Sequence, residues 1–171
     1  DQAEAAYKTA LRLDPEFVPA RFNLAMLYND QGNKAGAERM LREVVTLAPD
    51  MAEAHYSFGL LLAEDENRIA EALQALGTAA KLAPEHARIQ YNYALALQKQ
   101  NRNDEAEKAL LAACRWAPRD FDILCATASF YAGQENWSEA RRWAERLLSL
   151  DSNNPQATSL WLRVRQAEAA Q

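Results

Sequence analysis

The chain has 171 residues and a formal net charge of -5. Apolar residues make up 49% and charged residues 25%, a composition that favours a folded chain over a disordered one. The acidic balance argues against a nucleic-acid partner, which would need a basic surface to displace counterions from phosphates. No apolar run is long enough to predict a membrane-inserted helix.

The chain begins with one helical pattern, which is followed by a repeated unit of two helical patterns. In residues 18–51 two helical patterns are separated by a turn at Gly32 and closed by Pro49. The closing position recurs every 34 or 35 residues, at Pro15, Pro49, Pro84, Pro118 and Ser152. A period of this length is typical of a stacked array of one supersecondary unit.

Columns of small residues keep the same register in every unit. The residue twelve positions before the closing position is always alanine, at Ala3, Ala37, Ala72, Ala106 and Ala140. The first pattern of each complete unit carries a second small column, at Ala25, Gly59, Ala94 and Ala128. Small side chains allow two helices to approach closely, so both columns are predicted to lie in helix–helix contacts.

These residues resemble the tetratricopeptide repeat family, whose pattern has a small residue in its first helix, an early alanine in its second and a closing proline. The resemblance implies an all-α fold, a right-handed α-solenoid of antiparallel helix pairs. It implies the second helix of a truncated repeat at 1–17, repeats at 18–51, 52–86, 87–120 and 121–154, and a C-terminal capping helix at 155–171.

Two departures from the family pattern are local. The family's early tryptophan is replaced in the four complete repeats by Arg21, His55, Gln90 and Leu124. The second repeat has one extra residue near Asp65 and no glycine at that turn, an insertion that costs little because loop entropy grows slowly with length.

No pattern in the chain predicts chemistry. His55 and His86 are far apart and share no motif with Cys114 or Cys125, and a glycine-rich phosphate loop is missing. No catalytic residue, cofactor site or metal site is therefore predicted. The cysteines are expected to be buried free thiols, although a disulfide between them is conceivable. The compartment stays open between the cytoplasm and the bacterial periplasm.

The resemblance implies that the first helix of each pair lines a concave groove, and helical spacing selects its inward side chains. The predicted partner-binding residues are Phe22, Asn23, Met26, Tyr56, Leu60, Arg88, Tyr91, Asn92 and Leu95. Exposed aromatic and apolar side chains often mark partner sites, and an asparagine amide can pair with a peptide backbone. The alternative is that the apolar side chains pack against the neighbouring second helices.

The sequence therefore predicts a scaffold that binds a protein or peptide and has no catalysis of its own. The basic clamp by which some family members hold a terminal carboxylate is missing, because its places hold Phe22, Met26, Ser57, Asp122 and Ala126. Three alternatives stay open: a self-association module, a regulatory module of a larger enzyme, and an enzyme in its own right.

Overall fold

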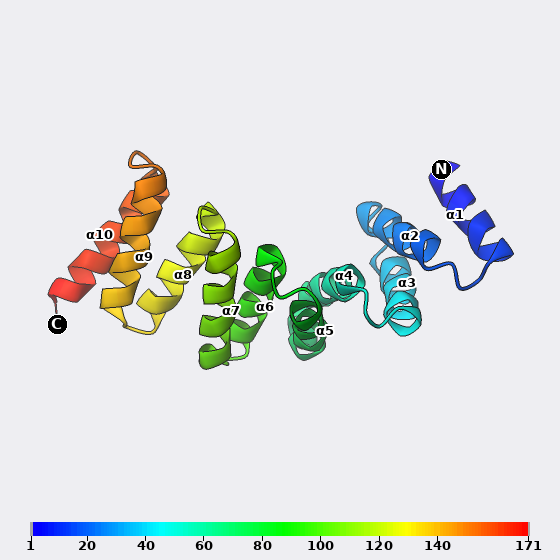
Figure 1. Ribbon diagram of the computed structural model, residues 1–171, viewed down its shortest axis with the longest axis horizontal. Coiled ribbons are helices and arrows are strands. Elements are labelled where there is room, and N and C mark those ends of the chain that lie inside the picture. Colours follow the sequence, from blue (N-terminus) through cyan, green and yellow to red (C-terminus); the bar gives the residue numbers. More distant parts are fainter. Residues whose placement is uncertain (1, 171) are drawn as a thin grey trace. The chain divides into compact units, whose positions relative to one another are not determined.

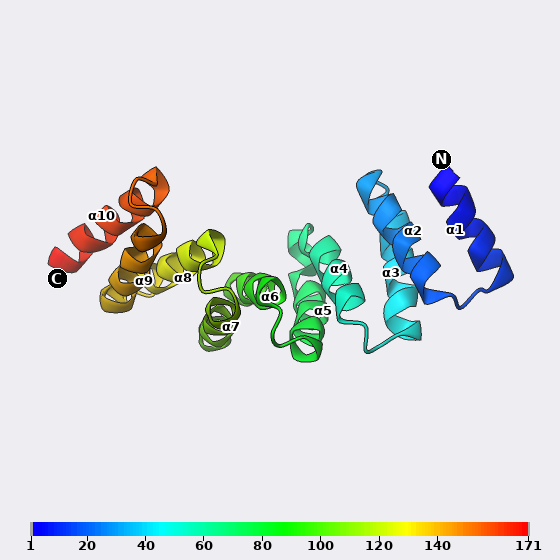
Figure 2. The same cartoon turned by 45° about the horizontal axis from the view of Figure 1, so that its top comes forward.

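The structure is a computed structural model that describes residues 2–170, and all regular structure in that range is helical. The prediction of an all-α chain is confirmed. The chain divides after Pro84 into two compact units. In both units consecutive helices fold back on each other as antiparallel pairs joined by short turns (Figures 1 and 2).

The first unit holds α1 (Gln2–Leu13), α2 (Val18–Asp30), α3 (Lys34–Leu47), α4 (Ala52–Ala63), a short 3-10 turn (Glu66–Arg68) and α5 (Ile69–Leu82). The second holds α6 (Ala87–Lys99), α7 (Asn103–Trp116), α8 (Phe121–Gly133), α9 (Trp137–Leu150) and α10 (Pro155–Ala169). Helices α2, α4, α6 and α8 correspond to the first helices of the repeat, and α3, α5, α7 and α9 to the second.

Side-chain caps set several helix starts. The side chain of Asn33 accepts a hydrogen bond from the Gly36 backbone N–H at 3.0 Å, and Asp120 accepts from Ile123 at 3.1 Å. Asn154 accepts from the N–H groups of Gln156 and Ala157, next to Pro155 in the first turn of α10. Each cap satisfies donors that would otherwise lack a partner at the helix end.

The turn inside three of the helix pairs needs one residue in the left-handed backbone region. That residue is Gly32 with φ 73°, Asn101 with φ 56° and Glu135 with φ 56°. Glycine adopts this region freely and asparagine tolerates it, but glutamate does so at a cost. In the remaining pair the extra residue forms the 3-10 turn instead, begun by Asp65, whose side chain accepts from the Asn67 N–H.

The predicted small columns lie in the core. Ala37, Ala72, Ala106 and Ala140 are each 0% exposed, and so are Ala25, Ala94 and Ala128. At Gly59 an added Cβ would lie 2.7 Å from Cγ of Leu76, which belongs to the paired helix. The close helix–helix approach predicted from these columns is therefore confirmed.

The two end helices differ in what they bury. Helix α10 packs its stripe of Ala157, Leu160 and Val164 against α9 and α8, and each of these residues is at most 5% exposed. In α1 the corresponding columns are open, because Ala3 is exposed and Tyr7 is half-buried. Among the described residues, α1 packs against α2.

Candidate functional site

The predicted partner-binding residues of the first unit lie on α2 and α4. Some of them are half-buried against the core and others are exposed to solvent. Phe22 and Met26 are half-buried and pack against the core formed around Leu24, whereas Asn23 is exposed. Tyr56 is half-buried and Leu60 is 37% exposed. Phe22 and Met26 thus pack in part against the core, as the alternative interpretation expected. Every side chain in this set nevertheless keeps some solvent-accessible surface.

In the second unit the predicted residues form a charged and aromatic cluster. The Arg88 guanidinium donates to the Asp120 carboxylate at 3.2 Å and to Asp122 at 3.4 Å, and lies 5.3 Å from the ring centroid of Tyr91. Asn92 and Leu95, on the same helix, are half-buried. Burial, followed by the charge of Asp122, raises the pKa of the Tyr91 phenol, which therefore remains a neutral O–H group at physiological pH.

Sequence reasoning missed the role of Asp120 in this cluster. Arg88 and Asp122 are 34 residues apart, so they occupy the same position on successive first helices, and this spacing was a signal for their contact. Asp120 also caps α8 through its other carboxylate oxygen. With two carboxylates beside it, Arg88 presents a compensated charge and serves to orient the Tyr91 ring.

The cysteines are both free. Cys114 is buried, with its Sγ 3.3 Å from the Thr127 hydroxyl. The expectation of a second buried thiol is wrong for Cys125, which is half-buried because it lies on the side of α8 where Gln156, at the start of α10, approaches to 3.5 Å. Burial raises the pKa of both thiols, which opposes formation of a nucleophilic thiolate.

The histidines have structural contacts. Nε2 of His55 lies 2.9 Å from the Pro49 carbonyl oxygen, and Nδ1 of His86 accepts from the Ile89 N–H at the start of α6. Within residues 2–170 no three His, Cys, Asp or Glu side chains gather as a metal site would require. None of the helices described there is long and apolar enough to cross a membrane.

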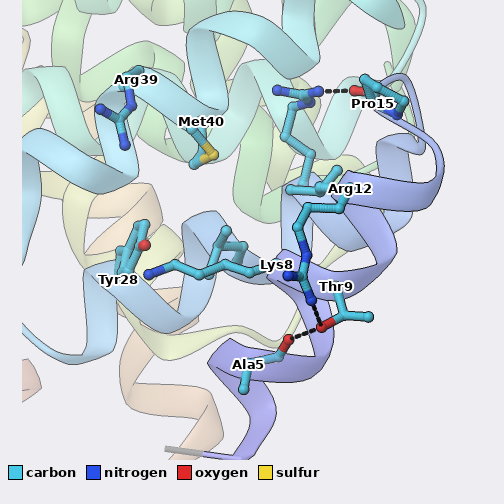
Figure 3. A pocket seen from close by; sticks show the side chains of 11 residues that line it. Ala5, Lys8, Thr9, Arg12, Pro15, Tyr28, Arg39 and Met40 are labelled. Atoms are coloured by element: carbon cyan, nitrogen blue, oxygen red, sulfur yellow. Dashed lines mark hydrogen bonds between the residues drawn. The ribbon is translucent and has the colours of Figure 1, made fainter.

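A cavity of about 670 Å³ lies between α1, α2 and α3, all within the first unit (Figure 3). Its apolar lining includes Leu11, Leu24 and Met40. Lys8 and Arg12 reach it from α1, and Arg39 comes from α3 on the other side (Figure 3). No motif in the sequence marks these residues as a site.

The cations at this cavity differ in how they are paired. The Lys8 ammonium lies 2.7 Å from the Glu4 carboxylate, and this hydrogen bond raises the pKa of Lys8. The same carboxylate accepts from the Tyr28 hydroxyl at 3.3 Å. Arg12 donates to the Thr9 hydroxyl at 2.9 Å, which is a neutral partner. The side chain of Arg39 has no hydrogen bond or ion pair to any other residue in the range 2–170.

A second cavity, of about 380 Å³, lies in the second unit beside small residues of α8. Ser129, Ala132 and Gly133 of α8 form part of its wall, with Trp137 from the start of α9. Arg163 and Val164 of α10 also line it, so the chain's own last helix provides one side of the space.

Comparisons with known proteins identify the repeat. Family models described as "Tetratricopeptide repeat" match residues 1–60 and 63–124, and a second such model matches residues 94–155. Among curated proteins, the chain is 35% identical over 106 residues to "Protein O-mannosyl-transferase Tmtc2" of Drosophila melanogaster. The match covers 58% of this chain but 11% of that protein, so the chain spans about a tenth of the length of this relative.

Solved structures share the fold over most of the chain. MamA is 25% identical, with a TM-score of 0.78 over 87% of this chain and 81% of that one. YrrB, described as a TPR protein with an unusual peptide-binding site, is 20% identical, with a TM-score of 0.79 over 92% and 81%. PilF of Pseudomonas aeruginosa is 21% identical, with a TM-score of 0.79 over 99% and 79%.

Proposed function

Because the chain belongs to the tetratricopeptide repeat family, we propose that it is a scaffold that binds a protein or peptide segment through its first helices. The α-solenoid of antiparallel helix pairs is a protein-interaction fold, and its first helices carry the side chains with which a partner would make contact. In this proposal the chain contributes recognition and no chemistry of its own.

The observation that carries the proposal is the partial exposure of an apolar and amide set on these helices. Phe22, Tyr56 and Tyr91 occupy the same position in three successive repeats, and each remains half-buried rather than enclosed. Met26, Leu60 and Leu95 follow one turn later, and Asn23 and Asn92 directly follow Phe22 and Tyr91 in the sequence. Half-buried aromatic side chains can gain further contact area from a partner without first unfolding their own surroundings.

The amides and the arginine add specificity to this apolar surface. The side chain of Asn92 can both donate to a peptide carbonyl and accept from a peptide N–H. Arg88 holds the Tyr91 ring through a cation–π contact while its charge is balanced by Asp120 and Asp122. The first helices therefore favour an extended segment with apolar side chains over a purely ionic ligand. The peptide-binding site ascribed to YrrB supports the same class of partner.

A displayed library of random dodecapeptides, panned on the whole chain, tests the proposal without a known partner. Enriched peptides are synthesised with a fluorophore, and their affinities are measured by fluorescence anisotropy. Tyr56→Ala and Tyr91→Ala should each weaken binding by on the order of 1–2 kcal/mol if these rings are central anchors. Asn92→Ala should cost about 1 kcal/mol, the net value of one hydrogen bond.

Trp116→Ala provides the matched control. Trp116 is an aromatic residue that is 56% exposed, lies at the end of a second helix and is not one of the proposed contact residues. Its loss should leave the affinity unchanged, and moderate salt should weaken binding only slightly because the contacts are mainly apolar. Peptides that bind the Tyr56→Ala/Tyr91→Ala double variant as tightly as the original chain would remove the basis of the proposal.

The similarity to an O-mannosyl-transferase favours a second candidate function, that of a regulatory or oligomerisation module attached to an enzyme. The matched region is a small part of that relative, so the repeats here would position a catalytic domain or join copies of it. Sequencing the gene on both sides of this region tests whether the repeats are attached to a catalytic domain. Sedimentation equilibrium of the isolated segment tests whether the repeats join copies of the chain, and a monomer at all concentrations would argue against self-association.

A further inference from the structure

We propose that the cavity between α1, α2 and α3 is a docking site for an acidic peptide segment that carries an aliphatic or aromatic side chain. This site shares no residue with the first-helix surface: its cations Lys8, Arg12 and Arg39 come from α1 and α3, and the side chains that α2 contributes are not the proposed partner-binding ones. The inference rests on the charge of the cavity, on its apolar lining and on the contrast with the corresponding crevice one repeat later.

The walls of the cavity carry more positive than negative charge, in a chain that is acidic as a whole. Lys8 is compensated by Glu4, and Arg21, which also lines the cavity, pairs with Glu43. Arg12 and Arg39 have no carboxylate partner among residues 2–170. Two uncompensated guanidinium groups on opposite sides of a cleft attract a ligand that carries carboxylates on both flanks.

In the corresponding crevice one repeat later, the arginines are paired with carboxylates of the chain itself. This crevice lies between α3, α4 and α5, and Arg42 there takes the place of Lys8. Glu38 holds Arg42 at 2.9 Å and Arg68 at 2.7 Å, and Glu71 holds Arg68 at 3.0 Å. Every cation in this second crevice is therefore matched by a carboxylate of the chain itself.

Three substitutions between the repeats account for the difference. Arg12 is replaced by Thr46, Arg39 by Gln74, and Gly36 by the acidic Glu71 at the corresponding positions. The second crevice has a volume of about 230 Å³, against about 670 Å³ for the first. The first crevice thus combines the free cations with the larger space, whereas the second is smaller and its arginines are paired with carboxylates of the chain.

The apolar residues that line the cavity indicate which side chain of the bound peptide would lie between its carboxylates. Leu11, Leu24 and Met40 offer an apolar surface, and methionine adapts its shape to different side chains. The volume falls within the range of clefts that enclose small ligands or a few side chains. Arg12 on α1 and Arg39 on α3 border the cleft (Figure 3), where they can contact the two flanks of a bound polypeptide segment. An acidic segment with a central apolar side chain satisfies both the charge and the floor.

The test uses the whole chain and a displayed library of random dodecapeptides, with selection carried out at low salt. Enriched peptides should combine acidic residues with an aliphatic or aromatic residue. Their affinity, measured by fluorescence anisotropy, should fall about tenfold or more in the Arg12→Glu/Arg39→Glu double variant. Rising salt should weaken the same peptides, because the charges at the cleft are exposed to solvent.

The matched control is the Arg115→Glu/Arg119→Glu double variant. Both of these arginines are exposed, and the double variant changes the net charge by the same amount as the test variant. It should retain the affinity of the original chain. Circular dichroism checks that both double variants stay folded, and Arg12→Gln/Arg39→Gln should give an intermediate loss if charge reversal disturbs the helices.

Several outcomes would overturn the docking site. Enriched peptides without an excess of acidic residues, or acidic peptides that bind both double variants equally, would show that the cavity recognises nothing of this chemistry. Peptides that lose binding only in Tyr56→Ala and Tyr91→Ala would support the first-helix surface and eliminate this one. Peptides that respond to Arg12 and Arg39 but not to the tyrosines would support this site alone.

Discussion

Replacement of Gly59 by alanine tests whether the small columns hold the helices together. In a helix interior, alanine ordinarily stabilises the fold relative to glycine by about 1 kcal/mol. At Gly59 the added methyl group would lie 2.7 Å from Leu76 Cγ, 2.9 Å from its Cδ2 and 3.0 Å from its backbone nitrogen. Leu76 is 1% exposed and has no space into which to withdraw, so α4 and α5 would have to move apart.

Overpacking of this kind typically costs about 1–3 kcal/mol, which exceeds the gain in helix propensity. We expect Gly59→Ala to lower the free energy of unfolding by about 1 kcal/mol, or about 2–4 °C in melting temperature for a chain of this size. Gly133→Ala is the control, because Gly133 is the last residue of α8 and its added Cβ would meet nothing within 4 Å. That change should stabilise by up to about 0.5 kcal/mol.

Thermal unfolding followed by circular dichroism at matched protein concentration measures both variants. The test is one of sign, since one change should destabilise and the other should not. A melting temperature that rises equally in Gly59→Ala and Gly133→Ala would refute the close helix contact. It would also refute the register from which the small columns were assigned, because Gly59 stands in the same column as Ala25 and Ala94.

Four further predictions use the same unfolding measurement. Ala72→Leu should cost about 1–3 kcal/mol by overpacking, whereas Leu at the exposed Ala35 should change stability by less than about 0.5 kcal/mol; equal effects would contradict the register. Glu135→Gly should stabilise by about 1 kcal/mol, because glycine relieves the left-handed strain at φ 56°, and an unchanged melting temperature would argue against that strain. Hydrogen bonding from Arg68 lowers the pKa of Glu38 to about 2, so this contribution to stability is present above pH 4.5 and lost as the pH falls toward 2; Glu38→Gln should melt with less dependence on pH in that window. Removal of residues 155–171 should lower stability and solubility by exposing the face that α10 covers, and a truncated chain that matches the original would show that α10 is dispensable.

The periodic part of the fold was predictable from the sequence because each repeat places the same side chain in the same environment. Ala37, Ala72, Ala106 and Ala140 are fully buried as their common position required. The left-handed backbone conformation also recurs with the repeat, because Asn101 and Glu135 occupy the position that Gly32 has in the first complete repeat. A column therefore carries information that a single residue does not, because glutamate alone gives no reason to expect a left-handed backbone.

The features that the sequence did not reveal depend on contacts between residues at different positions of the repeat. Arg88 and Asp122 share a position, and their pairing could have been inferred from that spacing, but the contribution of Asp120 depends on the path of the loop before α8. The basic cavity beside α1 was missed for a similar reason. Lys8 and Arg12 read as ordinary solvent-facing charges until the structure places Arg39 on the opposite wall.

The residues that hold this fold and the residues that distinguish its repeats are different sets. The buried alanines and leucines recur in every pair, so they cannot tell one partner from another. The two crevices of the first unit differ instead where Thr46 replaces Arg12 and Gln74 replaces Arg39, at positions that the core does not use. Changes at such positions can alter recognition with little effect on stability, because each repeat is stabilised mainly by its own columns and its neighbours. This separation is why variants at the exposed Arg12 and Arg39 should unfold close to the temperature of the original chain, so that a loss of affinity can be assigned to the lost contact.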